Sequence, residues 1–188
     1  MKKLIVASLL LFTVGSVKAQ KLALIPKAGI NISTQAIEGL GNEKGKVGFQ
    51  GGLGLNIQTG DNFSIQPEIN YVSKGTKLEF GNTKTSLDLN YLEVPILAKY
   101  AFGPVYVNAG PSIGLSVDKK STVARNYGDE LKKIDFGVQM GAGLALPLGK
   151  GKVIIDGRYA LGLNNIAKNG NEIKNRGILT SLGYMIPF

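Results

Sequence analysis

Seven charged residues stand inside stretches where apolar and polar residues alternate, and their types could do chemistry. Carboxylates and amines at such positions can form buried ion pairs, or can pass protons or ions along a path. A structural ion-pair network is the simpler interpretation, because an unpaired buried charge is costly. A proton or ion path would use the same residue types and stays open as an alternative. The seven residues are Lys27, Glu68, Glu93, Lys99, Asp135, Asp156 and Arg158.

Composition excludes most other chemistry. The 188-residue sequence contains no His and no Cys. This excludes His-dependent triads, cysteine nucleophiles, thiolate zinc sites, ordinary haem ligation and disulfides. We therefore expect no catalytic residue, no metal and no cofactor. The hydrophobic content of 44% argues against disorder, and the length favours one domain.

The first residues have the pattern of a secretory signal peptide. Lys2 and Lys3 precede an apolar run from Leu4 to Val17, and Val17-Lys18-Ala19 resembles a cleavage site. The run is short for a transmembrane helix, and a buried N-terminal helix is the alternative interpretation. We predict a signal peptide at 1–19 and a single β-barrel domain at 20–188. Removal of the signal peptide lowers the formal charge from +9 to +6, because three of the lysines lie in it.

Beyond the signal peptide the pattern has a period of two, which is typical of strands. Most of the alternating segments are long enough to cross a bilayer as tilted strands, which takes about 9–11 residues. Short turns at 59–62, 102–104 and 148–152 alternate with longer polar stretches at 35–45, 75–84, 118–133 and 165–175. This predicts an all-β fold, an eight-stranded antiparallel up-and-down transmembrane β-barrel. The predicted strands are 24–34, 46–59, 62–74, 85–102, 104–117, 134–148, 153–164 and 176–188.

The size of the residues on each face separates two kinds of barrel. One face of each strand is polar and rich in small residues, as in the alternate positions from Gly48 to Asn56. The other face carries large apolar residues such as Leu53, Ile96 and Met140. Small residues suit the crowded interior of an eight-stranded barrel, and lipid accepts Leu and Ile on the outside. A soluble lipocalin-like barrel, which has its apolar face inside, is the alternative and fits less well.

The segment Tyr91–Tyr100 (YLEVPILAKY) carries a family resemblance. It resembles the signature strand of the outer membrane protein beta-barrel domain family, which is abundant in Bacteroidota. The flanking strands agree in order over essentially the whole mature chain. The family is similar in architecture to small eight-stranded OmpX-like and OmpA-like barrels. The resemblance implies export to the cell outer membrane. It supplies no active-site residues, and most members have no assigned activity.

Function is predicted only in outline, as a non-enzymatic structural or interaction role in the cell envelope. The barrel enzymes of this membrane resemble one another in using a catalytic His, which this chain lacks. Two alternatives remain, a narrow pore or transport component and an accessory barrel of a protein-secretion apparatus. We expect lipid and lipopolysaccharide of the outer membrane as partners, with a further envelope protein unknown. Nucleic acid is not expected, despite the basic composition.

The four loop regions 35–46, 74–86, 118–133 and 165–176 together carry a net charge of +6, which is the whole net charge of the predicted mature chain. Basic groups near an anionic surface gain about 1 kcal/mol each, and at moderate salt this attraction is screened within about 10 Å. One interpretation is that these loops contact the phosphates or acidic sugars of the outer leaflet. The other is that the charges are only solvated. The residues predicted to make outer-leaflet contacts are Lys119, Lys120, Arg125, Lys132 and Lys133.

Overall fold

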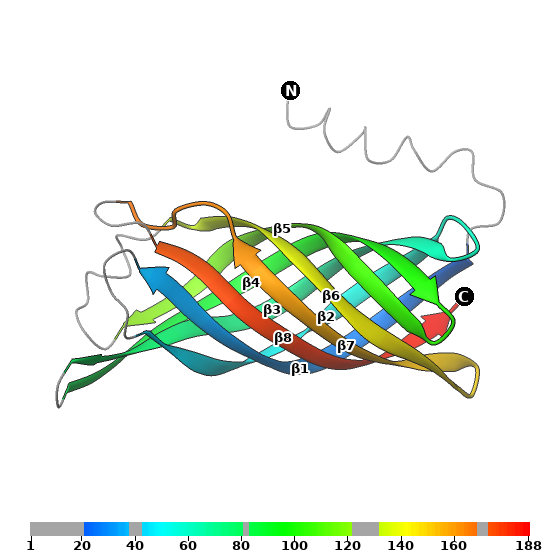
Figure 1. Cartoon of the computed structure of the whole chain (residues 1–188), viewed down its shortest axis with the longest axis horizontal. Helices are drawn as coiled ribbons and strands as arrows, with labels where there is room; N and C mark the ends of the chain where they lie inside the picture. Colours follow the sequence, from blue (N-terminus) through cyan, green and yellow to red (C-terminus); the bar gives the residue numbers. More distant parts are fainter. Residues whose placement is uncertain (1–20, 38–42, 81–82, 122–131, 169–172) are drawn as a thin grey trace, which may run out of the picture.

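Eight strands close into an antiparallel barrel in which each strand pairs with its neighbours in sequence and β1 pairs with β8 (Figure 1). The structure is a computed structural model that describes residues 21–37, 43–80, 83–121, 132–168 and 173–188. The predicted fold class is confirmed, and the predicted signal peptide lies outside the described residues. The strands are β1 (Lys21–Ile37), β2 (Glu43–Gln58), β3 (Phe63–Phe80), β4 (Thr83–Phe102), β5 (Val105–Ser121), β6 (Ile134–Leu148), β7 (Gly151–Gly162) and β8 (Ile173–Pro187).

The two ends of the barrel differ. The β2–β3, β4–β5 and β6–β7 connections are tight turns at one end, where the start of β1 and the C-terminus also lie (Figure 1). Gly103 and Gly149 lie in two of these turns with φ of 67° and 61°, a conformation that other residues rarely adopt. We call this the short-turn end and the opposite one the long-loop end.

One predicted loop is wrong. The stretch 75–84 was expected to be a long polar loop. In the structure, however, β3 continues to Phe80 and β4 starts at Thr83. The two strands stay paired up to Phe80↔Thr83, so they form one long hairpin that projects at the long-loop end (Figure 1). Strand β5 likewise continues to Ser121 and takes in the first residues of the expected 118–133 loop. Backbone pairing extends these strands through stretches whose polar composition had indicated loops.

The alternation in sequence places side chains as predicted. Large apolar residues such as Leu53, Ile96 and Met140 lie on the outer surface, where each is 46–48% exposed. The small and polar residues of the opposite face point into the lumen. Among the described residues, no helix is long and apolar enough to cross a membrane.

Exposed aromatic residues lie toward both ends of the outer surface. At the short-turn end Phe63 pairs with Tyr100, whose ring packs 4.8 Å from that of Phe102. Phe49 and Phe136 are exposed nearer the long-loop end. Aromatic girdles of this kind mark the two interfaces of a membrane barrel.

Candidate functional site

The lumen holds all seven charged residues that the sequence singled out. Each points inward from its strand. Glu68, Glu93, Lys99, Asp135, Asp156 and Arg158 are each at most 5% exposed, and the Lys27 side chain is 8% exposed. They fall into two groups, which we call the lower cluster (Lys27, Glu68, Lys99, Asp156 and Arg158), nearer the short-turn end, and the upper cluster (Glu93 and Asp135, with Lys74).

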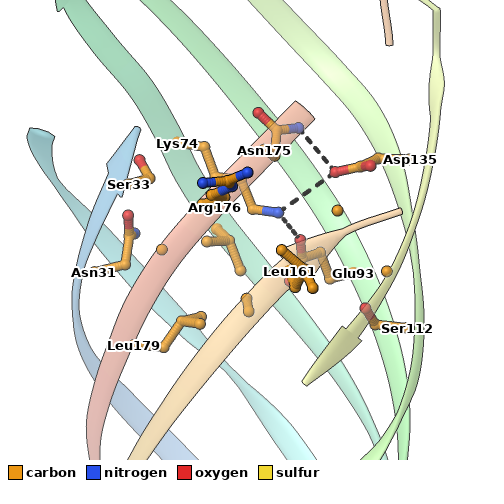
Figure 2. A pocket seen from close by; sticks show the side chains of 15 residues that line it. Asn31, Ser33, Lys74, Glu93, Ser112, Asp135, Leu161, Asn175, Arg176 and Leu179 are labelled. Atoms are coloured by element: carbon orange, nitrogen blue, oxygen red, sulfur yellow. Dashed lines mark hydrogen bonds and ion pairs between the residues drawn. The ribbon is translucent and has the colours of Figure 1, made fainter. Parts of the chain in front are cut away.

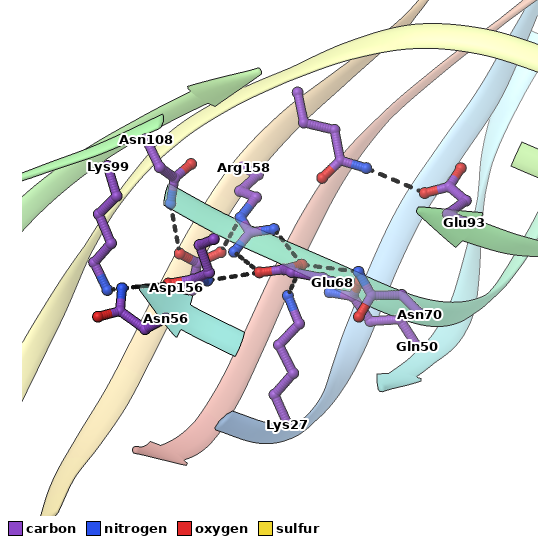
Figure 3. Close-up of polar contacts among 12 residues, drawn as sticks. Lys27, Gln50, Asn56, Glu68, Asn70, Glu93, Lys99, Asn108, Asp156 and Arg158 are labelled. Atoms are coloured by element: carbon purple, nitrogen blue, oxygen red, sulfur yellow. Dashed lines mark hydrogen bonds and ion pairs between the residues drawn. The ribbon is translucent and has the colours of Figure 1, made fainter. Parts of the chain in front are cut away.

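Glu68 on β3 is the centre of the lower cluster. The guanidinium of Arg158 on β7 donates two hydrogen bonds to its carboxylate, each of 2.8 Å, across the barrel (Figure 3). The ammonium of Lys27 on β1 approaches Oε2 to 2.5 Å. The side-chain amides of Gln66 and Asn70 donate further bonds of 2.7 and 2.9 Å. Five donor contacts therefore fill the acceptor positions of this one carboxylate.

Asp156 is the second carboxylate of the lower cluster, and its acceptor positions are also occupied. Nε of Arg158 lies 2.5 Å from Oδ1. The hydroxyl of Tyr106 and the amide of Asn108 donate to Oδ2 at 2.7 and 3.0 Å. Arg158 thus bridges the two carboxylates, and Tyr106 and Asn108 on β5 hold Asp156 in place.

Lys99 differs from the other lumen cations. Among the described residues it forms no ion pair. Its ammonium donates one long hydrogen bond to Gln66 (3.4 Å) and lies 3.8 Å from the centre of the Tyr106 ring. Neighbouring β3 supplies the amide of Gln66 and neighbouring β5 the aromatic face of Tyr106, and the described residues of neither strand supply a carboxylate within ion-pair distance.

The upper cluster contains a cation that the sequence analysis left out. Lys74 on β3 forms ion pairs with Glu93 on β4 and, at 3.7 Å, with Asp135 on β6 (Figure 2). It was counted with the charge of the loop region 74–86, but it lies in the lumen because β3 continues past it. Its even number, in phase with the inward Glu68, is the signal that could have placed it. Amides complete the cluster, from Gln139 to Glu93 (3.1 Å) and from Asn175 to Asp135 (2.8 Å).

Apolar layers separate and close the two clusters. Val72, Ala160 and Leu179 form a layer of buried residues between them. Toward the long-loop end a cluster that includes Leu89, Tyr91 and Ile166 covers the upper cluster. The cavity beside the upper cluster has about 20 Å³, room for about one water. The described lumen is therefore filled by side chains over most of its length.

Toward the short-turn end the lumen opens into a larger space. An apolar group of Ile25, Tyr106 and Ile154 narrows the lumen there. Outside it lies a hollow of about 120 Å³, which we call the vestibule. Its polar and charged lining includes Asn56, Asp61, Ser64, Lys99, Tyr106 and Lys152.

The basic residues expected at the outer leaflet are only partly described. Lys132 and Lys133 are exposed at the long-loop end, immediately before β6. Lys132 donates 3.0 Å and 2.7 Å hydrogen bonds to the carbonyls of Asn165 and Ile166, from its side chain and its backbone. The side chains of Lys119 and Lys120, and the whole of Arg125, lie outside the described residues.

The described part of the chain shows no group of three acidic, His or Cys residues that could hold a metal ion. What the lumen residues can do is neutralise one another. Contacts across the barrel, such as that between Glu68 and Arg158, join strands that are distant in the sequence.

Comparison with known proteins assigns the chain to a family. A profile of the outer membrane protein beta-barrel domain matches residues 18–168. A comparison with curated proteins gives no match.

Solved structures of small outer-membrane barrels share the fold at low sequence identity. OprG from Pseudomonas aeruginosa superposes with a TM-score of 0.55 at 13% identity, over 92% of this chain and 98% of that one. Neisserial surface protein A gives 0.53 at 12% identity, over 88% and 97%. Ail of Yersinia pestis, in complex with the heparin analogue sucrose octasulfate, gives 0.50 at 16% identity, over 90% and 100%. The chain therefore belongs to the outer membrane protein beta-barrel domain family, and it is an eight-stranded barrel of the outer membrane.

Proposed function

We propose that this barrel neither conducts nor catalyses, and that it acts through the surface it presents at its long-loop end. The observation that carries this proposal is the filled lumen. Ion pairs and apolar layers occupy its cross-section, and the cavity at the upper cluster holds about one water. A pore would need a continuous aqueous path, which wider barrels provide. The absence of His from the sequence supports a role without catalysis.

The orientation follows from the connections. Outer-membrane barrels have short periplasmic turns and longer extracellular loops. The short-turn end would then face the periplasm and the long-loop end the exterior, so export through cleavage of the signal peptide at 1–19 belongs to the same proposal. Mass spectrometry of the protein purified from membranes should give a mature N-terminus at Gln20.

For the long-loop end we propose contact with the phosphates or acidic sugars of lipopolysaccharide. Lys132 and Lys133 are exposed there, and Arg176 lies exposed on β8. On β8 Arg176 stands next to the outward Ile178, which is 52% exposed, at the edge of the apolar outer surface. Basic residues at this level are attracted to an anionic leaflet. Salt screens that attraction, so it acts only within about 10 Å.

Three measurements test this function. In planar bilayers the purified protein should give no steady conductance, and stable channels would favour the pore alternative instead. Neutralising Lys119, Lys120, Lys132 and Lys133 together should weaken lipopolysaccharide binding at low salt, with a smaller loss at high salt. Equal binding by the parent and the quadruple variant at low salt would mean that these charges are only solvated. A protein that co-purifies in mild detergent would favour the secretion-accessory alternative.

A further inference from the structure

The charges of the lumen are separated along the barrel axis. With all groups ionised, the upper cluster has one cation and two carboxylates, because Lys74 faces both Glu93 and Asp135. The lower cluster has three cations and two carboxylates. The apolar layer around Val72 keeps the two apart. The lower cluster therefore has one positive charge in excess.

The excess charge belongs to Lys99. Both carboxylates of the lower cluster are already occupied by donors, Glu68 by Lys27, Arg158 and two amides, and Asp156 by Arg158, Tyr106 and Asn108. Lys99 is 5% exposed and has only an amide oxygen and an aromatic face beside it. A buried ammonium without a direct ion pair is costly, so an anion that reached it would bind favourably.

Space and further donors lie where such an anion would enter. Lys99 lines the vestibule at the edge of the lower cluster, beside Asn56 (Figure 3). Lys152, from the start of β7, is a second cation of its lining. Ser64 accepts a 2.9 Å bond from the Asn56 amide, which leaves its own hydroxyl hydrogen free to donate. About 120 Å³ is room for a tetrahedral oxyanion with some of its waters.

Asp61 is the one carboxylate among the described residues that line this space. It lies in the exposed β2–β3 turn and forms no ion pair with either lysine. We propose that the vestibule is a binding site for a small inorganic oxyanion of the phosphate or sulfate class, held by Lys99 with Lys152 at its rim. The site lies at the opposite end of the barrel from the lipopolysaccharide surface and does not depend on it.

The test is a phosphate titration of the folded barrel in detergent, followed by amide and lysine side-chain NMR at constant ionic strength. Phosphate should cause saturable shifts confined to the vestibule, including the Asn56 side-chain amide, whereas the same ionic strength of chloride should not. Replacing the buried ammonium by Lys99→Met should weaken binding about ten- to hundredfold, the range for a lost hydrogen bond to a charged group. Lys99→Arg keeps the charge and should retain most of the binding.

Lys150→Met is the matched control, because Lys150 is an exposed lysine in the β6–β7 turn at the same end and does not line the vestibule. It should bind phosphate as the parent does. Shifts spread over all exposed lysines, or equal affinity of the parent and Lys99→Met, would overturn the proposal. If circular dichroism shows that Lys99→Met does not fold, the titration of the parent protein is the test. The absence of saturable vestibule shifts in the parent would also overturn the proposal.

Discussion

Glu68 is the residue on which the lumen depends most. Its carboxylate joins β1, β3 and β7 through Lys27 and Arg158, which lie 41 and 90 residues away in the sequence. Ion pairs of this kind are not by themselves strong evidence of stability, because each charge lost its water on burial. The cost arises when one partner is removed and the others stay charged.

Glu68→Gln should therefore destabilise the barrel strongly. The amide removes the counter-charge of Lys27 and one of the two counter-charges of Arg158, and turns a donor toward the guanidinium. We expect a loss of about 3–5 kcal/mol in the free energy of unfolding. Urea titration followed by circular dichroism measures this, because the chain has no Trp for fluorescence. Asp61→Asn, in an exposed turn, should change stability by less than about 0.5 kcal/mol. Equal effects of the two variants would contradict the central role of Glu68.

At the scale of elements, close approach of the strands explains particular glycines. Gly143 on β6 pairs with Tyr106 on β5 and Asp156 on β7. A Cβ at this position would overlap the Tyr106 hydroxyl and the carbonyl oxygen of Ile155. The Tyr106 ring can lie flat over β6, and its hydroxyl can reach Asp156, because Gly143 has no side chain.

Gly143→Ala should consequently displace Tyr106 and its hydrogen bond to Asp156. We expect a loss of about 1–3 kcal/mol, the usual cost of overpacking a filled interior. The same urea titration measures it. Gly60→Ala is a suitable control, since a Cβ there would meet only Phe63 at an ordinary 3.8 Å. A stability of Gly143→Ala equal to that of the parent would show that Tyr106 moves freely, against the packing described.

The end of β8 closes the barrel against β1. The backbone N–H of Phe188 donates to the carbonyl of Leu22 at 3.0 Å. The Tyr184 hydroxyl donates to the carbonyl of Leu148 at 2.7 Å and accepts from the N–H of Gly151 at 3.2 Å. These bonds hold the C-terminal end of β8 against β1 and connect β8 to the β6–β7 turn.

Deleting Phe188 should reduce assembly into the membrane, because it removes the terminal aromatic ring and the last hydrogen bond between β8 and β1. The fraction of folded protein in the outer-membrane pellet is the measurement, and unassembled chain should be lost to periplasmic proteases. Phe102→Ala, at another exposed aromatic position of the same end, should assemble nearly as the parent. Full assembly of the deletion variant would show that β8 pairs with β1 without this residue.

For the whole molecule, closure decides the stability. Every strand has two neighbours, so no edge leaves its backbone groups unpaired in the hydrocarbon. The cross-lumen ion pairs add contacts between strands that the sheet does not join directly.

A closed barrel should migrate differently in SDS gels before and after boiling. The unboiled protein should keep a β-type circular dichroism spectrum and resist protease within its strands, because SDS does not open a fully paired sheet. Identical migration of both samples, together with rapid digestion of the strands, would contradict closure in the native protein.

Local pattern determined which face of each strand is inside. A period of two makes successive side chains point to opposite faces, and the small and polar residues of one face mark it as the inner one. Placing Leu53 outside and Glu68 inside therefore required no knowledge of the partners. The strand number, the tight turns that follow β2, β4 and β6, and the family resemblance followed from the same local pattern. The prediction failed at the β3–β4 hairpin, where pairing continues through a stretch that was expected to be a loop. For this reason Lys74, the last residue of the predicted strand 62–74, was counted with the loop charges.

Which charges meet was decided only by the tertiary structure. The contact between Glu68 and Arg158 depends on the register and tilt of eight strands around a closed circle, and no local pattern contains these quantities. The same geometry divided the lumen charges into two clusters and left Lys99 facing the vestibule without a carboxylate. Sequence alternation can show that a charge points inward, but the distance across a barrel is a property of its closure.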